Sequence, residues 1–240
     1  LKLELSKIFL SLSELQSLTL EFSHFKGLGI EEGDIKIVVA SSPSLWLEDV
    51  FQAIGKREKL KKFSFNIFGW NSGESEGFFK VFWQSLKKLT QLIDLSIDIV
   101  SDQMIKDQEI SALAQCFKEL SKIQNLRFEI LTGSSFKPRT LVALLDCIAK
   151  SLPWLSKFTL SFEQVNLTHH SYQLLCQAIQ KMRCLNSIRL SFSGELENGL
   201  DIQLLKTALN KRIPTEISHK STPFASELVR EGKGRIHLLI

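Results

Sequence analysis

Six stretches of the chain share one pattern of hydrophobic positions, which reads apolar-x-x-apolar-x-apolar-x-apolar. They are LQSLTLEF from Leu15, LKKFSFNI from Leu60, LIDLSIDI from Leu92, IQNLRFEI from Ile123, LSKFTLSF from Leu155 and LNSIRLSF from Leu185. Their first residues are separated by 45, 32, 31, 32 and 30 positions. Four nearly equal steps in succession indicate an internal repeat with a period of about 31 residues.

Each of these stretches is preceded by apolar residues that fit one face of a helix. Before Leu92, for example, Phe82, Leu86 and Leu89 stand ten, six and three places upstream. Spacings of four and then three residues place side chains on the same side of a helix. Within the stretch the apolar spacing becomes two, which is typical of a strand. The repeating unit is therefore predicted to be a helix, a short turn, a strand and a loop.

A unit of this kind cannot bury its apolar side alone, so neighbouring units must stack on one another. Parallel strands joined by helices then form one parallel sheet with every helix on the same face. Because helices are wider than the ~4.8 Å spacing of strands, we expect the stack to bend with its strands on the inside. The predicted fold is α/β, a solenoid in the shape of a horseshoe, with the parallel β-sheet on its concave face and the α-helices on its convex face.

The spacing of the strand leucines resembles leucine-rich repeats of the ribonuclease-inhibitor type, over about residues 1–212. The resemblance is carried by Leu15, Leu18 and Leu20, repeated as Leu92, Leu95 and Ile97 and again as Leu185, Ile188 and Leu190. The family's usual Asn or Cys, three places after the last strand leucine, is replaced by Ser23, Phe68, Val100, Leu131, Glu163 and Ser193. The chain is in this respect similar to the divergent repeats that are abundant in ciliates and other protists. The resemblance implies a leucine-rich-repeat solenoid of about 7–8 repeats.

We interpret the whole chain, 1–240, as a single leucine-rich-repeat domain. Regular repeats cover about 1–212, and residues 213–240 form a degenerate C-terminal repeat or cap. An irregular insertion at 24–46 accounts for the long first step, and we expect it to emerge as a loop on one rim, with an extra strand from Ile35 to Ala40. In the cap, Thr222 and Pro223 predict the start of a helix that runs through Arg230, followed by a final strand, RIHLLI.

Composition excludes several classes of protein. The net charge of +4 is small for 240 residues, and no basic stripe occurs, so we expect no nucleic-acid binding. No apolar run reaches the roughly 18 residues of a membrane span. The four cysteines form no CxxC pair, and most of them are expected in neighbouring helices that are too far apart for a relaxed disulfide. Reduced thiols favour an intracellular, cytoplasmic location. The resemblance also allows a cytoskeletal or ciliary one.

The residue types that carry out chemistry are not arranged as known sites require. His169 and His170 are the only histidine cluster, predicted to lie in an exposed loop before a helix, and no acidic or cysteine partner stands at the spacing of a metal site. The glycines of GLGIEEG depart by one residue from the dinucleotide-binding spacing. No nucleophile elbow or phosphate-binding loop occurs. We therefore predict that the chain is not an enzyme and binds no cofactor or metal.

The strand residues that alternate with the buried ones are expected to point into the concave face. The charged ones, Glu21, Asp94, Asp98, Arg127, Glu129 and Arg189, form a row of mixed sign and are candidates for contact with a partner. A solvated face explains this row equally well. If a partner binds there, we expect its basic groups to lie opposite the acids. Trp46, Phe68 and Trp70 fall in predicted loops, where exposed aromatic rings would form an apolar interface.

These observations predict a non-catalytic protein–protein interaction or scaffold module, whose protein partners bind through the concave face and rim loops. A module of this kind is also a candidate subunit of a large assembly. Because the sequence begins with Leu rather than Met, a second interpretation stays open. In that interpretation the repeats are the regulatory or sensor region of a larger enzyme or signalling protein.

Overall fold

The computed structural model describes residues 14–22, 28–31, 34–39, 46–70, 78–101, 105–132, 137–163, 168–193, 227–231 and 235–239. The strands are β1 (Ser17–Phe22), β2 (Leu28–Glu31), β3 (Asp34–Val39), β4 (Lys62–Trp70), β5 (Asp94–Ser101), β6 (Asn125–Thr132), β7 (Lys157–Glu163), β8 (Ser187–Ser193), β9 (Glu227–Glu231) and β10 (Arg235–Leu239). The helices are α2 (Trp46–Ile54), α3 (Phe78–Leu86), α4 (Asp107–Phe117), α5 (Pro138–Ser151) and α6 (His169–Lys181). The helix predicted at the start of the chain lies outside the described residues.

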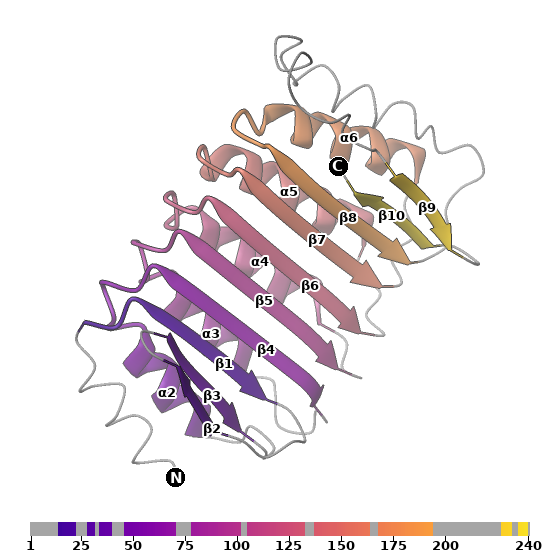
Figure 1. The fold of residues 1–240 in the computed structure, drawn as a ribbon. Coiled ribbons are helices and arrows are strands. Elements are labelled where there is room, and N and C mark those ends of the chain that lie inside the picture. Colours follow the sequence, from indigo (N-terminus) through magenta and orange to yellow (C-terminus); the bar gives the residue numbers. More distant parts are fainter. Residues whose placement is uncertain are drawn as a thin grey trace.

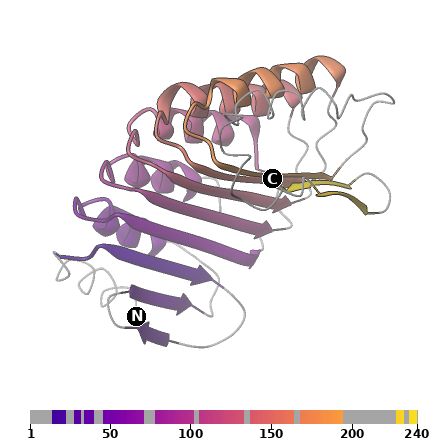
Figure 2. The same ribbon diagram turned by 45° about the horizontal axis from the view of Figure 1, so that its top comes forward.

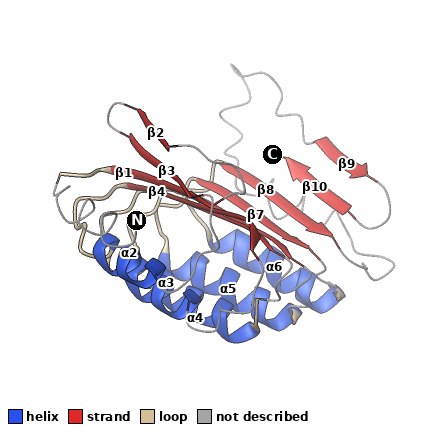
Figure 3. Cartoon of the chain, turned by 90° about the horizontal axis from the view of Figure 1, so that it is seen from below, coloured by secondary structure: helices blue, strands red, loops and turns tan. Residues whose placement is uncertain are grey.

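The described strands form one sheet in the order β2-β3-β1-β4-β5-β6-β7-β8-β10-β9 (Figure 1). Six of them, β1 and β4 to β8, run parallel, and helices α2 to α6 alternate with them along the chain. The five helices of the described residues all cover the same face of the sheet (Figure 3). The prediction of α/β units with parallel strands and one helical layer is confirmed for these repeats.

The lateral register aligns the six sequence stretches residue by residue. Leu18 of β1 lies opposite Phe63 of β4, which lies opposite Leu95 of β5. The same row continues through Leu126 of β6 and Phe158 of β7 to Ile188 of β8. Because side chains alternate between the two faces of a strand, this register sends every repeat's apolar row to the helix side.

The core lies between the sheet and the helical layer. In it, the first apolar residues of four repeats, Leu60, Leu92, Ile123 and Leu155, are at most 1% exposed. Phe65 of β4 packs against Phe82 of α3 with ring centroids 4.5 Å apart. Complete burial of a ring of this size stabilises a fold by about 1.5–3 kcal/mol. The stacked repeats therefore share one continuous hydrophobic core.

Backbone hydrogen bonds also join successive repeats where each strand begins. The carbonyl of Lys61 accepts from the N–H groups of Ile93 (2.7 Å) and Asp94 (3.0 Å) in the next repeat. The carbonyls of Gln16, Ile93, Gln124 and Ser156 accept equivalent pairs at 2.7–3.1 Å. One oxygen thus satisfies two amides of the following turn, since a carbonyl carries two lone pairs. The column fixes the position of each strand relative to its neighbour.

The insertion extends the sheet, whereas the sequence predicted a rim loop. Within 24–46, β2 and β3 pair antiparallel, and β3 pairs parallel with β1 at the N-terminal edge (Figure 2). The strand expected from Ile35 to Ala40 is confirmed as Asp34–Val39. Pairing with β3 satisfies backbone groups of β1 that an edge strand would leave open, which is the physical reason for this outcome.

The C-terminal cap corrects a second prediction. The helix predicted through Arg230 is wrong at its end, because residues Glu227–Glu231 form strand β9. The final strand is confirmed as Arg235–Leu239, and it pairs antiparallel with both β8 and β9. An all-parallel sheet therefore holds for the repeats but not for the ends. The hairpin covers the backbone edge of β8, and this pairing outweighs the local signal of a helix start.

Candidate binding surface on the open sheet face

The face of the sheet that carries none of the described helices presents two rows of mainly polar side chains, and we call it the open face. One row runs through Thr19, Ser64, Ser96, Arg127, Thr159 and Arg189, and the other through Glu21, Asn66, Asp98, Glu129, Ser161 and Ser191. These positions alternate with the buried ones, as the sequence predicted. Five of the six charged candidates therefore share two rows, and Asp94 stands next to them on β5.

The centre of the open face is an ion-paired cluster. Arg127 on β6 donates from Nε to Oδ1 of Asp98 on β5 at 3.1 Å, and from Nη2 to Oε2 of Glu129 at 3.0 Å. The Asn66 amide on β4, in the orientation that satisfies its neighbours, donates to Oδ2 of Asp98 at 3.3 Å. The acids are only 16% and 18% exposed, whereas the Arg127 side chain is 47% exposed. Arg127 thus covers both carboxylates.

Burial sets the electrostatics of these acids. It raises the pKa of Asp98 above its usual value, and the charge and hydrogen bond of Arg127 oppose that shift. Burial also raises the pKa of Glu129, as the charge of Asp98 does to a smaller extent, while the charges of Arg127 and Arg189 lower it. Partial removal from water disfavours a charged carboxylate, and a nearby cation favours it. Arg127 therefore opposes the effect of burial on the pKa of both acids.

Asp94, the remaining acid in this part of the face, is also held internally. Its Oδ1 accepts a hydrogen bond from Nδ2 of Asn125 on the neighbouring strand. The expectation that a partner's basic groups lie opposite Asp94, Asp98 and Glu129 is therefore weakened, since each of these acids has a partner within the sheet. Glu21, on β1, is half-buried and also takes part in an interaction.

Three cations of the open face differ from the acids. Lys62 on β4, Lys157 on β7 and Arg189 on β8 are exposed, and their side chains make no hydrogen bond or ion pair with the described residues. Lys62 and Lys157 line an open depression of about 470 Å³, together with Asn125 and Arg127. The groups on this face that are available to a partner are therefore mainly cationic donors.

The structure places the three aromatic candidates in regular elements, and the prediction that they lie in loops is wrong. Trp46 is the first residue of α2, and Phe68 and Trp70 belong to the last part of β4. β4 extends this far because it continues to pair with β5, with a bulge between Phe68 and Trp70. The three residues are therefore not brought together by a common loop, and an aromatic interface stays a prediction.

The described residues provide no metal site and no membrane helix. No group of three or more His, Cys, Asp or Glu side chains in them is placed to hold a metal ion. The described helices are all too short or too polar to cross a bilayer. His169 and His170 are exposed as predicted, but they form the first turn of α6, where Thr168 caps the helix by accepting from the N–H of Ser171 at 3.2 Å.

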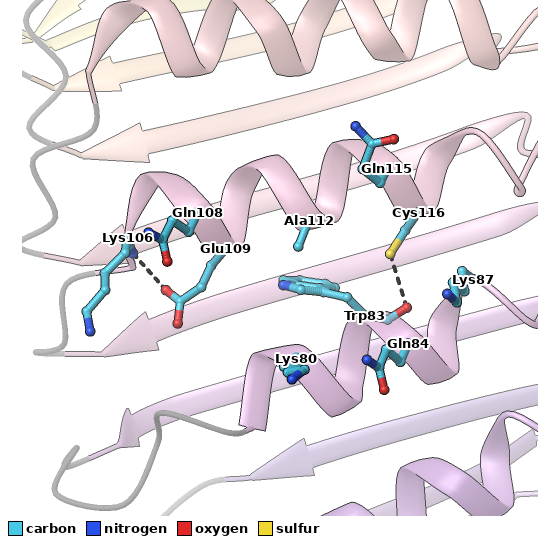
Figure 4. A pocket seen from close by; sticks show the side chains of 10 residues that line it. All are labelled: Lys80, Trp83, Gln84, Lys87, Lys106, Gln108, Glu109, Ala112, Gln115 and Cys116. Carbon is cyan, nitrogen blue, oxygen red and sulfur yellow. Dashed lines mark hydrogen bonds between the residues drawn. The ribbon is translucent and has the colours of Figure 1, made fainter.

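A second hollow, which the sequence did not indicate, lies between α3 and α4 on the helical side (Figure 4). Its volume is about 510 Å³, and Trp83 and Ala112 line it from the two helices. The available signal was the small Ala112 side chain on α4 facing a large ring on α3. That signal becomes readable only once the facing of the two helices is known.

The sequence matches no model of a known protein family, and no curated protein matches it significantly.

Proposed function

We propose that this chain is a leucine-rich-repeat solenoid that binds a protein partner without catalysing a reaction, and that its open sheet face receives an acidic segment of that partner. The supporting observation is the division of charge on the face. Its half-buried acids are paired internally with Arg127 and Asn125, whereas the side chains of Lys62, Lys157 and Arg189 make no hydrogen bond or ion pair with the described residues.

The physical case rests on what a partner must supply. Lysine and arginine side chains are donors without acceptor capacity, so carboxylates are their natural complement in a protein. Complementary charges of this kind mainly increase the association rate and the selectivity of binding. A rigid sheet built from stacked repeats gives a partner an extended surface of fixed geometry. In this proposal the surface is concave, as the bending of a horseshoe requires.

A charge-reversal variant tests the proposal. In the face variant, Lys62, Lys157 and Arg189 are each changed to Glu. The control variant changes Lys56, Lys88 and Lys118 to Glu, which alters net charge equally at exposed positions away from the open face. Both proteins are used to capture partners from the native cell, with quantitative mass spectrometry. We expect the face variant to lose its stoichiometric partners and the control to keep them.

Equal recovery of the same partners by both variants would contradict binding at this face. Retention of RNA or DNA that depends steeply on salt would instead indicate a nucleic-acid surface, which the sequence does not favour. The second candidate, a regulatory region of a larger enzyme or signalling protein, uses the same face. It would be supported if the captured acidic segment belonged to a catalytic domain of the same polypeptide.

A further inference from the structure

The hollow between α3 and α4 has the dimensions of a small-molecule site. Its volume of about 510 Å³ lies within the range of roughly 300–1,000 Å³ that is usual for ligand pockets. Its walls combine an apolar part, made by Trp83, Ala112 and the thiol side chain of Cys116, with a polar rim (Figure 4). It lies on the helical side of the sheet, so it is separate from the open face.

The indole of Trp83 carries an unsatisfied donor. Trp83 is 2% exposed, and its Nε1 has no hydrogen-bond partner among the described residues. The ring is held in place by Phe79, with centroids 5.8 Å apart, and by Phe82, at 4.6 Å. A buried N–H group without an acceptor is unfavourable, and native structures usually satisfy it with protein, water or ligand. The indole N–H of Trp83 would therefore be stabilised by a hydrogen-bond acceptor in the hollow.

No acceptor that lines the hollow makes a hydrogen bond with this N–H, and that includes the exposed amides of Gln84, Gln108 and Gln115. Glu109 is the acidic residue on the rim, and its Oε2 already accepts from the backbone N–H of Lys106 at 2.7 Å, at the start of α4. The thiol of Cys116 donates to the carbonyl oxygen of Trp83 at 3.1 Å. Burial raises the pKa of this thiol to about 12, so it stays protonated and offers no negative charge.

Two lysines add positive charge beside the same ring. Lys80 and Lys87 stand three residues before and four residues after Trp83, so they share its helix face. Both are exposed, and neither makes a side-chain hydrogen bond or ion pair within the described part of the chain. The unpaired donors of the hollow thus include an indole N–H and two ammonium groups, beside the exposed amides of Gln84, Gln108 and Gln115, which can both donate and accept.

We propose that the hollow between α3 and α4 binds a small planar anion, an aromatic or similarly flat apolar body that carries a carboxylate. The flat body lies against Trp83 and Ala112, and the carboxylate accepts from Trp83 Nε1 and from the ammonium groups of Lys80 and Lys87. Binding here does not depend on the function proposed for the open face, because the two surfaces lie on opposite sides of the sheet.

The test uses 2-naphthoate as the probe and the indole N–H resonances of the full chain as the readout. The sequence has four tryptophans, and Trp83→Phe assigns the resonance of interest. We expect the Trp83 signal to move downfield and to saturate with a Kd of roughly 1 mM, which is typical of a ligand of this size. The uncharged 2-naphthamide should bind at least about fivefold more weakly, because it lacks the charge that the lysines recognise.

Variants separate the site from general association. Lys80→Gln with Lys87→Gln should weaken naphthoate binding about fivefold or more, while Lys56→Gln with Lys88→Gln, at exposed positions that do not line the hollow, should leave it unchanged. Ala112→Leu should fill the hollow and abolish the shift, with an unchanged circular dichroism spectrum showing that the chain is folded. A Trp83 resonance unmoved at about 10 mM naphthoate, or equal affinity for the amide, would overturn the proposal.

Discussion

Arg127 on β6 reaches across the sheet to Asp98 on β5, with Nε 3.1 Å from Oδ1, although the residue directly opposite Asp98 is Glu129. The two acids lie side by side in the register, and the guanidinium of Arg127 binds both, reaching diagonally to Asp98 and along its own strand to Glu129. A cation between two partly buried carboxylates converts a repulsive pair into a connected cluster. This relationship determines which charges of the open face remain available.

Loss of Arg127 should destabilise the fold in a pH-dependent way. We expect Arg127→Met to lower the free energy of unfolding by about 1 kcal/mol near neutral pH, a value discounted for the exposure of the guanidinium. The folded pKa values of Asp98 and Glu129, already raised by burial, should rise further. The folded variant then binds more protons than the unfolded chain, and its stability recovers as pH falls through that window.

Urea unfolding at about pH 7 and about pH 5 checks this pH dependence. The free energy of unfolding that Arg127→Met loses relative to the unaltered protein should be smaller at the lower pH. Lys157→Met is the matched control, since Lys157 is an exposed cation of the open face that has no ion pair in the described residues and is not among the charges that shift the pKa of either acid. Its stability should change by less than about 0.5 kcal/mol. A deficit for Arg127→Met that is the same at both pH values would contradict the internal pairing.

The contribution of Asp146 to stability should have the opposite pH dependence, and should disappear at acidic pH. A hydrogen bond from Lys150 and another from Lys181 hold the pKa of Asp146 below its usual value, so it links α5 to α6. A lowered pKa gives stability that is present above the unfolded pKa and is lost as pH falls through the folded pKa. Asp146→Asn should therefore cost less than about 1 kcal/mol near neutral pH and nothing at about pH 2. Glu119→Gln, an exposed carboxylate without an ion pair in the described residues, should show no such pH dependence.

Gly55, directly after α2, lies close to the backbone of α3. A Cβ atom at this position would lie 3.2 Å from the carbonyl oxygen of Ser85 and 3.3 Å from its Cα. Because these are backbone atoms, α3 would have to shift. We expect Gly55→Ala to lower the free energy of unfolding by about 1 kcal/mol and Gly55→Val to lower it by about 2–3 kcal/mol. If calorimetry gave the unaltered protein and both variants the same stability, α3 would have room to move away from residue 55.

The four cysteines should differ in reactivity. Cys116 and Cys176 are buried, and burial raises the pKa of the Cys116 thiol to about 12, whereas Cys147 and Cys184 are partly exposed. The thiolate is the reactive form, so burial and a raised pKa both slow modification. In native buffer we expect iodoacetamide to label Cys184 well before Cys116, and in urea all four alike, as measured by peptide mass spectrometry. Labelling of native Cys116 at the rate of Cys184 would be incompatible with this core.

The repeat in the sequence was sufficient to predict the parallel strands and which of their residues lie opposite one another. Leu95 and Leu126 stand at the same place in two repeats, and the structure sets them opposite each other on β5 and β6. Local signals failed where an unpaired strand edge was decisive. The helix-start signal at Thr222 and Pro223 could not reveal that Glu227–Glu231 pairs with β10.

The candidate surface was predictable in its position but not in its pairing. Alternation along β6 shows that Arg127 and Glu129 share a face, since they are two residues apart. It does not show that the Arg127 side chain reaches diagonally to Asp98, because that contact depends on the length and rotamer of a side chain. The hollow at Trp83 depends in the same way on how closely α3 and α4 pack.

Crosslinking of the native complex tests the central claim most directly. The full protein is crosslinked in its own cell through reagents that join lysines to carboxylates, and the joined peptides are identified by mass spectrometry. If the open face receives an acidic partner segment, Lys62 and Lys157 should be joined to carboxylates of one partner, while Lys88 and Lys118 are not. Partner crosslinks confined to Lys88, Lys118 or other lysines away from the open face would contradict it.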